Sequence, residues 1–353
     1  MLGDTESLKE RTGWCGNRCR RRRVARGISY VGLECNKSKG NICEILTLGL
    51  VKMGSVVEFD SPVDKYMTMK IARYGSFLIM LLSGWCAIAA PESRTDIFYG
   101  SDPDRPDRAL QTLDVYYEKD VSKQPVIIFI HGGGWAFGDK QDVNHKPDFF
   151  TAQGFAFISM NYRLRWDYKL YDQLQDVVSV VDWVHKNADS YGLAPSRVVL
   201  MGHGAGGHMA SLVGTDVRHL KGAGYDLSNI DAVVSINSVS YDIPRVHREL
   251  GSFVERRQHR IVFGEDEDVQ KQSSPIYHIK EGTKYPAFAL LFVPDQEGSR
   301  LQTEEFAKAL STESANVIMI PGNTKTKRSI NVELGAEGDR PSIALLAFLR
   351  AST

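Results

Sequence analysis

The chain has 353 residues with 43 Lys+Arg and 43 Asp+Glu, so its formal net charge is zero. Its 42% hydrophobic and 24% charged residues are typical of a globular protein and exclude a disordered, collagenous or coiled-coil one. The balanced charge argues against a nucleic-acid partner, because such binding depends on a surplus of Lys and Arg. The length is sufficient for one large α/β domain or two small ones.

The first ninety residues contain a candidate export signal. All five cysteines lie here, and Cys15 and Cys19 have no second pair of metal ligands at a matching spacing, so we expect no metal site. A short apolar run at 77–85 follows basic residues and precedes Ala-Ile-Ala at 87–89, as in a cleavable signal peptide. The run is too short to span a bilayer, which needs about 20 residues.

These features predict the domain organisation. We expect 67–90 to be a signal peptide and 1–66 to be an over-extension or a disordered arm ahead of the real start. The alternative is a cytoplasmic arm in which 77–90 acts as a signal anchor. Both interpretations place a secreted or periplasmic domain at 91–353, without disulfides and without a membrane span of its own.

From Asp96 onward, short β-rich runs alternate with amphipathic helices, which is the pattern of an α/β fold. The apolar runs predict strands at 113–117, 126–130, 155–160, 198–201, 232–236, 288–293 and 317–320. Helices are predicted at 171–191, 205–213, 301–310 and 343–349. We therefore expect a doubly wound, mostly parallel sheet, with 240–285 inserted over its carboxyl edge.

A glycine-rich motif follows the strand predicted at 126–130. His131 is followed by Gly132, Gly133 and Gly134. Because glycine has no side chain, these residues offer bare N–H groups at the carboxyl edge of the sheet. Such groups can stabilise the negative oxygen of a tetrahedral intermediate, so the motif predicts an oxyanion hole. The alternative is a tight turn that binds nothing.

A second glycine motif, GHGAGGH at 202–208, lies between the strand 198–201 and the helix 205–213. A strand, a sharp turn and a helix in this order make a nucleophile elbow of the G-x-S-x-G type. The N–H of Ala205 would complete the oxyanion hole. Gly204, however, stands where the serine belongs, and it has no side chain to attack a carbonyl.

Residues 95–350 resemble the α/β-hydrolase superfamily, in its HGGG-containing carboxylesterase and lipase branch. The resemblance is carried by HGGGWAFGDK (131–140), NYRL (161–164) and GHGAGGH (202–208). These segments are similar to those of feruloyl/acetyl-xylan-esterase-like and kynurenine-formamidase-like enzymes. The resemblance implies an α/β-hydrolase fold, no cofactor, and a small ester or acylated carbohydrate as ligand.

The resemblance also implies a catalytic acid and a catalytic histidine further along the chain. By similarity the acid position falls on Gly298, although a small shift of register would select Asp295 or Glu297. The histidine position falls on Lys327, and the last histidine of the chain is His278, upstream of both segments. We therefore expect all three triad positions to be replaced.

The resulting hypothesis is an esterase-derived protein without family-type hydrolysis, which retains an oxyanion-type pocket for a carbonyl or acyl ligand. The alternative is an active carboxylic ester hydrolase with a displaced constellation, meaning that its catalytic groups lie at other positions and that His203 or His208 acts as the base. For both histidines, a role in packing is the simpler interpretation. A decaying product without a role is a third possibility. Asp139 and Lys140 are expected to fix the loop after Trp135 by local ion pairing.

Overall fold

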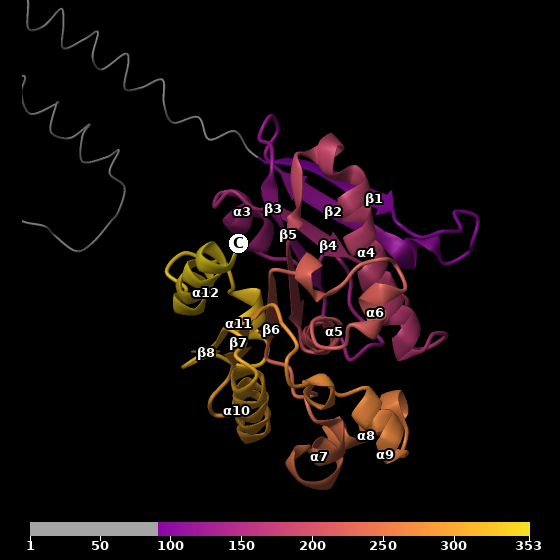
Figure 1. Cartoon of the computed structure of the whole chain (residues 1–353), viewed down its shortest axis with the longest axis vertical. Coiled ribbons are helices and arrows are strands. Elements are labelled where there is room, and N and C mark those ends of the chain that lie inside the picture. Colours follow the sequence, from indigo (N-terminus) through magenta and orange to yellow (C-terminus); the bar gives the residue numbers. More distant parts are fainter. Residues whose placement is uncertain (1–90) are drawn as a thin grey trace, which may run out of the picture. The chain divides into compact units, whose positions relative to one another are not determined.

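The computed structural model describes residues 91–353, so the expectations for 1–66 and 67–90 concern segments outside the described residues. The described chain forms one eight-stranded sheet in the order β1-β2-β4-β3-β5-β6-β7-β8 (Figure 1). Strand β2 pairs antiparallel with both of its neighbours, and all pairings from β4 through β8 are parallel. The predicted doubly wound, mostly parallel α/β sheet is confirmed.

Each predicted strand coincides with an observed one. The strands are β1 (Glu92–Phe98), β2 (Thr112–Tyr117), β3 (Gln124–Ile130), β4 (Ala156–Met160), β5 (Leu193–His203), β6 (Ala232–Ile236), β7 (Ala287–Phe292) and β8 (Val317–Pro321). The sequence did not predict β1, because its exposed, largely polar residues show no apolar run; it is an edge strand that pairs only with β2.

The predicted helices are also observed, and shorter ones join them. The α-helices are α3 (Lys146–Thr151), α4 (Leu170–Tyr191), α5 (Ala205–Val213), α6 (Arg218–Lys221), α7 (Ile243–Arg245), α8 (Phe253–Phe263), α9 (Glu267–Gln272), α10 (Glu297–Thr312), α11 (Ser329–Val332) and α12 (Arg340–Ser352). None of the helices within 91–353 combines the length and apolarity that a membrane crossing requires.

Helices cover both faces of the sheet (Figure 1). On β3, Ile128 and Ile130 belong to a core shared with α4, α5 and α10, whereas Ile127 and Phe129 belong to a core shared with α3 and α12. Because both faces are buried, the strand reads as a continuous apolar run and does not alternate with polar residues. This double cover holds the carboxyl ends of the central strands rigidly.

The segment 240–285 forms the expected insertion. It contains α7, a π-helical turn at Val246–Leu250, α8 and α9. Helix α8 begins with a capping box, in which the Ser252 side chain accepts from the Glu255 N–H and the Glu255 carboxylate accepts from the Ser252 N–H. The helix carries residues that line a cavity at the carboxyl ends of β3 and β5. The insertion therefore contributes directly to the site.

Candidate functional site

The two glycine motifs meet at one cavity of about 210 Å³. The loop after β3, the turn between β5 and α5, the segment after β6, helix α8 and the loop after β8 all contribute to its wall. The lining residues are Gly133, Gly134, Trp135, His203, Gly204, Ala205, Asn237, Val239, Ser240, Glu255, Gln258, His259 and Lys327.

A larger cavity, of about 750 Å³, lies between the start of α4, the end of α5 and helices α8 and α9. Leu174, Asp216 and Phe263 are among its lining residues, and it contains no residue of either glycine motif. The chemistry implied by the sequence therefore belongs to the smaller cavity.

Gly204 has the backbone of a nucleophile elbow. Its φ of 54° and ψ of −111° lie where residues with a side chain are strained. Its N–H donates to the Ile236 carbonyl at 2.9 Å, and its own carbonyl accepts from the His208 N–H at 2.9 Å. A Cβ atom added at this position would meet nothing within 4 Å. The turn thus keeps the shape and the space of an attacking residue while offering only main chain.

The neighbouring glycines serve a different purpose, which is close packing. A Cβ atom on Gly206 would lie 2.0 Å from the Ile130 carbonyl oxygen, and one on Gly202 would lie 2.2 Å from the carbonyl carbon of Gly206. Real side chains cannot approach backbone atoms so closely. These two glycines allow α5 to start directly against β3 and β5.

Three of the four residues predicted for the oxyanion hole line the cavity with Gly204. Within the described chain, the N–H groups of Gly133 and Gly134 donate no hydrogen bond. Ala205 is the first residue of α5, where N–H groups have no acceptor inside the helix and the helix dipole favours negative charge. Gly132 instead lines an adjacent cavity of about 320 Å³. An oxyanion role for these residues remains a prediction.

The segment after β4 supports the first glycine motif. The Tyr162 ring stacks on His131 with 4.2 Å between ring centroids, and its hydroxyl donates to the His131 carbonyl at 3.1 Å. The Asn161 side-chain oxygen accepts from the Lys140 N–H at 2.7 Å. The NYRL segment therefore positions the glycine loop from both ends.

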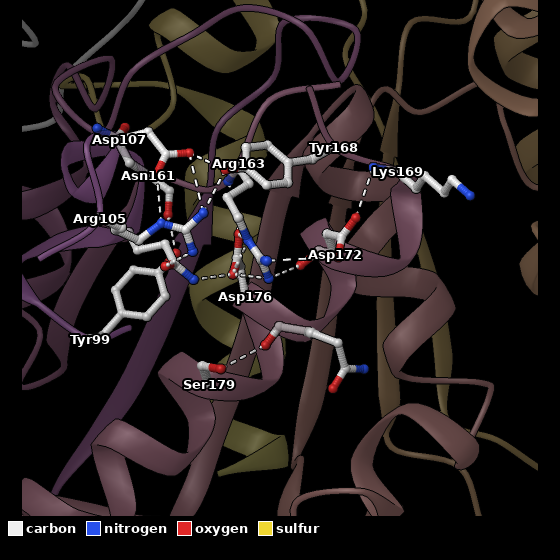
Figure 2. A network of polar contacts seen from close by, with 12 residues as sticks. Tyr99, Arg105, Asp107, Asn161, Arg163, Tyr168, Lys169, Asp172, Asp176 and Ser179 are labelled. Carbon is white, nitrogen blue, oxygen red and sulfur yellow. Dashed lines mark hydrogen bonds and ion pairs between the residues drawn. The ribbon is translucent and has the colours of Figure 1, made fainter. Parts of the chain in front are cut away.

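A polar network fixes this segment to helix α4, as Figure 2 shows. The Arg163 guanidinium contacts the buried Asp176 carboxylate at 2.7 Å and donates to the Asp172 carbonyl at 2.8 Å. Burial raises the pKa of Asp176, while the Arg163 hydrogen bond opposes that rise. Tyr168 and Arg105 both contact Asp107 and close the network on its outer side. The network is structural, and none of its residues lines the 210 Å³ cavity.

The expected ion pair between Asp139 and Lys140 is wrong. Lys140 is buried, and its Nζ lies 2.5 Å from Asp114 on β2 and 2.8 Å from Asp96 on β1. The Asp139 carboxylate accepts from the Gln141 N–H at 2.9 Å. Lys140 does fix the loop, but it does so through partners that are distant in the sequence, which the local pattern does not show.

His208 is a structural residue. Its Nδ1 accepts from the Trp135 indole N–H at 3.3 Å, so its Nε2 carries the proton that it donates to the Ser273 carbonyl at 2.7 Å. Burial lowers its pKa to about 4, which keeps the ring neutral at pH 7. Both nitrogens are occupied, so the ring joins the glycine loop to the insertion and has no lone pair left for a base.

His203 lines the cavity and also has a structural bond. Its Nε2 donates to the Lys327 carbonyl at 3.1 Å, and burial lowers its pKa to about 4. The ring packs against Gly132, where a Cβ atom would lie 2.7 Å from Nδ1. His203 therefore connects the elbow, the glycine loop and the loop after β8.

The cavity contains two of the three predicted triad positions, Gly204 and Lys327. The Lys327 Nζ lies 3.9 Å from the Glu255 carboxylate. Gly298 lies in the first turn of α10 and does not line the cavity; a Cβ atom there would be 3.0 Å from the Leu250 carbonyl oxygen. The alternative acids Asp295 and Glu297 are exposed and do not line the cavity either.

The sequence reasoning missed one pair of side chains in this cavity. Ser240 Oγ lies 2.9 Å from His259 Nε2, both residues are buried, and both line the cavity. They come from the irregular insertion, where no motif marks them, and only the packing of α8 brings them together. Within residues 91–353 there is no cluster of three or more His, Cys, Asp or Glu suited to a metal ion.

The sheet, the elbow and the glycine loop define an esterase- and lipase-like α/β-hydrolase. The BD-FAE family model matches residues 113–310, which is more than half of the chain. The chain therefore belongs to the BD-FAE family, within the carboxylesterase branch of the α/β-hydrolases, as its motifs indicate.

Individual relatives agree with this assignment. The chain is 30% identical to esterase LipC of Mycobacterium tuberculosis over 151 residues, which are 40% of this chain and 36% of LipC. It is 25% identical to the probable carboxylic ester hydrolase LipM of the same organism over 248 residues, 67% of this chain and 57% of LipM. The match therefore covers about a third of the length of LipC and somewhat over half of the length of LipM.

Solved structures show the same fold. Esterase B from Lactobacillus rhamnosis has a TM-score of 0.62 at 21% identity, and the match covers 81% of this chain and 96% of that one. Thermogutta terrifontis esterase 2 has a TM-score of 0.57 at 22% identity, covering 74% and 93% of the two chains. At this identity the likeness establishes the fold alone.

Proposed function

We propose that this protein binds a small carbonyl or acyl ligand in the 210 Å³ cavity and does not hydrolyse esters by the family mechanism. The observation that carries the proposal is Gly204, which has the backbone and the free space of the nucleophile position but no side chain. Hydrolysis through an acyl-enzyme requires an attacking oxygen or sulfur, and main chain cannot supply it.

The cavity still offers hydrogen-bond donors to a ligand. Gly134 and Ala205 line the cavity, and their N–H groups donate no hydrogen bond within the described chain, so they are available to a carbonyl oxygen. The start of α5 adds a favourable dipole. A volume of about 210 Å³ is below the usual range for drug-sized ligands, so the enclosed part of the ligand is a short acyl group. A phosphonate related to tributyrin inhibits Lactobacillus rhamnosis esterase B, in keeping with a small ester as the ligand class.

A test compares covalent labelling with binding, using the full chain. We expect neither labelling by a fluorophosphonate nor saturable turnover of p-nitrophenyl acetate, but saturable binding of methyl butanoate observed by NMR. Covalent labelling, or turnover well above a denatured control, would overturn the proposal.

One variant isolates the proposed carbonyl contact. Ala205→Pro removes the N–H at the first position of α5, where proline is well tolerated, and should weaken binding of methyl butanoate about tenfold. Glu267→Pro makes the same change at the first position of α9, away from the cavity, and should leave binding unchanged.

A second candidate function is an active carboxylic ester hydrolase with a displaced constellation. The Ser240–His259 pair favours it, because it places a hydroxyl beside an imidazole in the same cavity. Turnover that disappears in Ser240→Ala and persists in His208→Gln would establish this function.

We also propose that the domain is exported, on the strength of the apolar run at 77–85. Fractionation of the native source tests this, and recovery of the protein in the cytoplasmic fraction would contradict it. N-terminal sequencing then separates a cleaved signal peptide from a retained signal anchor.

A further inference from the structure

The Ser240–His259 pair has a hydrogen-bond donor to spare. A serine hydroxyl and a neutral imidazole carry one donor hydrogen each, and their mutual bond at 2.9 Å uses only one of them. If the hydroxyl donates, the proton on His259 Nδ1 remains; if Nε2 donates, the Ser240 hydroxyl proton remains. Either tautomer leaves one donor available.

No described residue accepts from that donor. His259 Nδ1 is buried and has no hydrogen-bond partner within the described chain, and Ser240 Oγ bonds only to His259 there. The His259 side chain is 2% exposed and packs against Trp135, with 5.8 Å between ring centroids, and against Phe263 at 5.5 Å. A buried donor without an acceptor is costly, and both residues line the cavity.

We infer that Ser240 and His259 form a second hydrogen-bonding subsite, which binds another acceptor oxygen of the ligand whose carbonyl lies against Ala205. The inference rests on the proposed function and narrows its ligand class. The ligand is a short acyl compound with two acceptor oxygens, of which a 3-oxo ester is the simplest probe.

The physical environment suits binding better than catalysis. Burial, with smaller contributions from the neighbouring His208, His247 and Lys327, lowers the pKa of His259 to about 3. At pH 7 only about one imidazole in 10⁴ would then be protonated. No carboxylate hydrogen-bonds to Nδ1 within the described residues, so nothing stabilises the imidazolium that a serine attack would create.

A matched pair of esters tests the subsite with the full chain. Methyl acetoacetate and methyl butanoate have the same carbon skeleton and ester group and differ by one keto oxygen. We expect the wild type to bind methyl acetoacetate about tenfold more tightly, which is the effect of one hydrogen bond to a buried donor. The ring nitrogen shifts of His259 should respond more strongly to methyl acetoacetate than to methyl butanoate.

The variants separate the subsite from the rest of the cavity. The double variant Ser240→Ala/His259→Phe removes both donors and should abolish the preference for the keto ester, because either single variant still leaves one donor free. Ser240→Thr, which keeps the hydroxyl, should retain the preference. Ser238→Ala is the matched control, since Ser238 is also buried but does not line the cavity, and it should retain the preference. If the double variant fails to fold, Ser240→Ala/His259→Leu removes the same two donors with a smaller side chain and decides the matter.

The outcomes distinguish this inference from the proposed function. Equal binding of the two esters by the wild type, or a preference that survives in the double variant, overturns the subsite while the binding function stands. Binding of neither ester overturns both. A mass increase on Ser240 after incubation with methyl acetoacetate would make Ser240 a nucleophile and overturn the assigned role.

Discussion

His203 donates a hydrogen bond from Nε2 to the carbonyl oxygen of Lys327 at 3.1 Å, across 124 positions of the chain. This bond holds the loop after β8 against the turn between β5 and α5. The position to which the resemblance assigns a histidine is therefore placed beside the position to which it assigns a serine. The bond thus brings together the two positions to which the resemblance assigns the nucleophile and the base.

This arrangement predicts the outcome of restoring the serine. Gly204→Ser has room for its side chain but must adopt a positive φ, so we expect a cost of about 1–3 kcal/mol in unfolding free energy and no esterase activity. Combining it with Gly298→Asp and Lys327→His has a better chance of producing turnover of p-nitrophenyl acetate. Activity from the single change would mean that the acid and base positions lie elsewhere.

A second triple variant tests the position of the acid. Gln296 accepts a hydrogen bond from Asn237, a cavity residue, at 3.2 Å, whereas Gly298 does not line the cavity. We expect Gln296→Asp to support turnover better than Gly298→Asp in the same background of Gly204→Ser and Lys327→His. The reverse order would confirm the position that the resemblance indicates.

The glycines around the elbow should respond differently to alanine. Gly206→Ala places a Cβ atom 2.0 Å from the Ile130 carbonyl oxygen, and we expect a loss of about 3 kcal/mol or more in unfolding free energy. Gly204→Ala meets no atom and should lose only about 1–2 kcal/mol, from its positive φ. Urea denaturation measures both, and equal losses would contradict a close-packing role for Gly206.

The buried lysine of the glycine loop provides a stability prediction. Lys140→Met leaves the buried Asp114 carboxylate without its cation and should lower the unfolding free energy by about 3 kcal/mol. Asp139→Asn, at an exposed neighbour, should change it by less than about 0.5 kcal/mol. A thermal melt of each variant measures the change in stability. A larger loss in Asp139→Asn than in Lys140→Met would support the ion pair between Asp139 and Lys140 that the structure does not show.

The buried histidines predict a fall in stability with acid. Burial lowers the pKa of His208 to about 4, while an unfolded imidazole has a pKa of about 6.5. Between these values the unfolded chain binds the extra proton, so His208 alone should lower the unfolding free energy by about 1.4 kcal/mol for each pH unit on going from 6.5 to 4. Above pH 7 its contribution is constant.

His208→Gln isolates that contribution, because glutamine can accept from Trp135 and donate to Ser273 without titrating. Urea midpoints measured from pH 7 to pH 4 should fall less steeply for the variant. Parallel curves would show that His208 has the same pKa in the folded and unfolded chains, and would contradict the lowered pKa.

Much of the fold could be read from local pattern. The apolar run at 126–130 and the stripe on 171–191 predict a buried strand and an amphipathic helix, and both are observed. The order of strand, glycine turn and helix at 198–213 also predicts the sharp turn of the elbow. This turn is formed by residues that are close together in the sequence. Strand β1 has no such signal, since its exposed residues gain their order only by pairing with β2.

The sequence by itself determined that this chain is an esterase-like α/β-hydrolase, and it predicts a glycine at the nucleophile position. Only the tertiary structure decided that Lys140 pairs with Asp114, that both nitrogens of His208 are occupied, and that Ser240 and His259 share the cavity with Gly204. The reason is physical. Periodicity and glycine spacing act over a few residues, whereas hydrogen-bond partners in a buried site are set by how whole elements pack against one another.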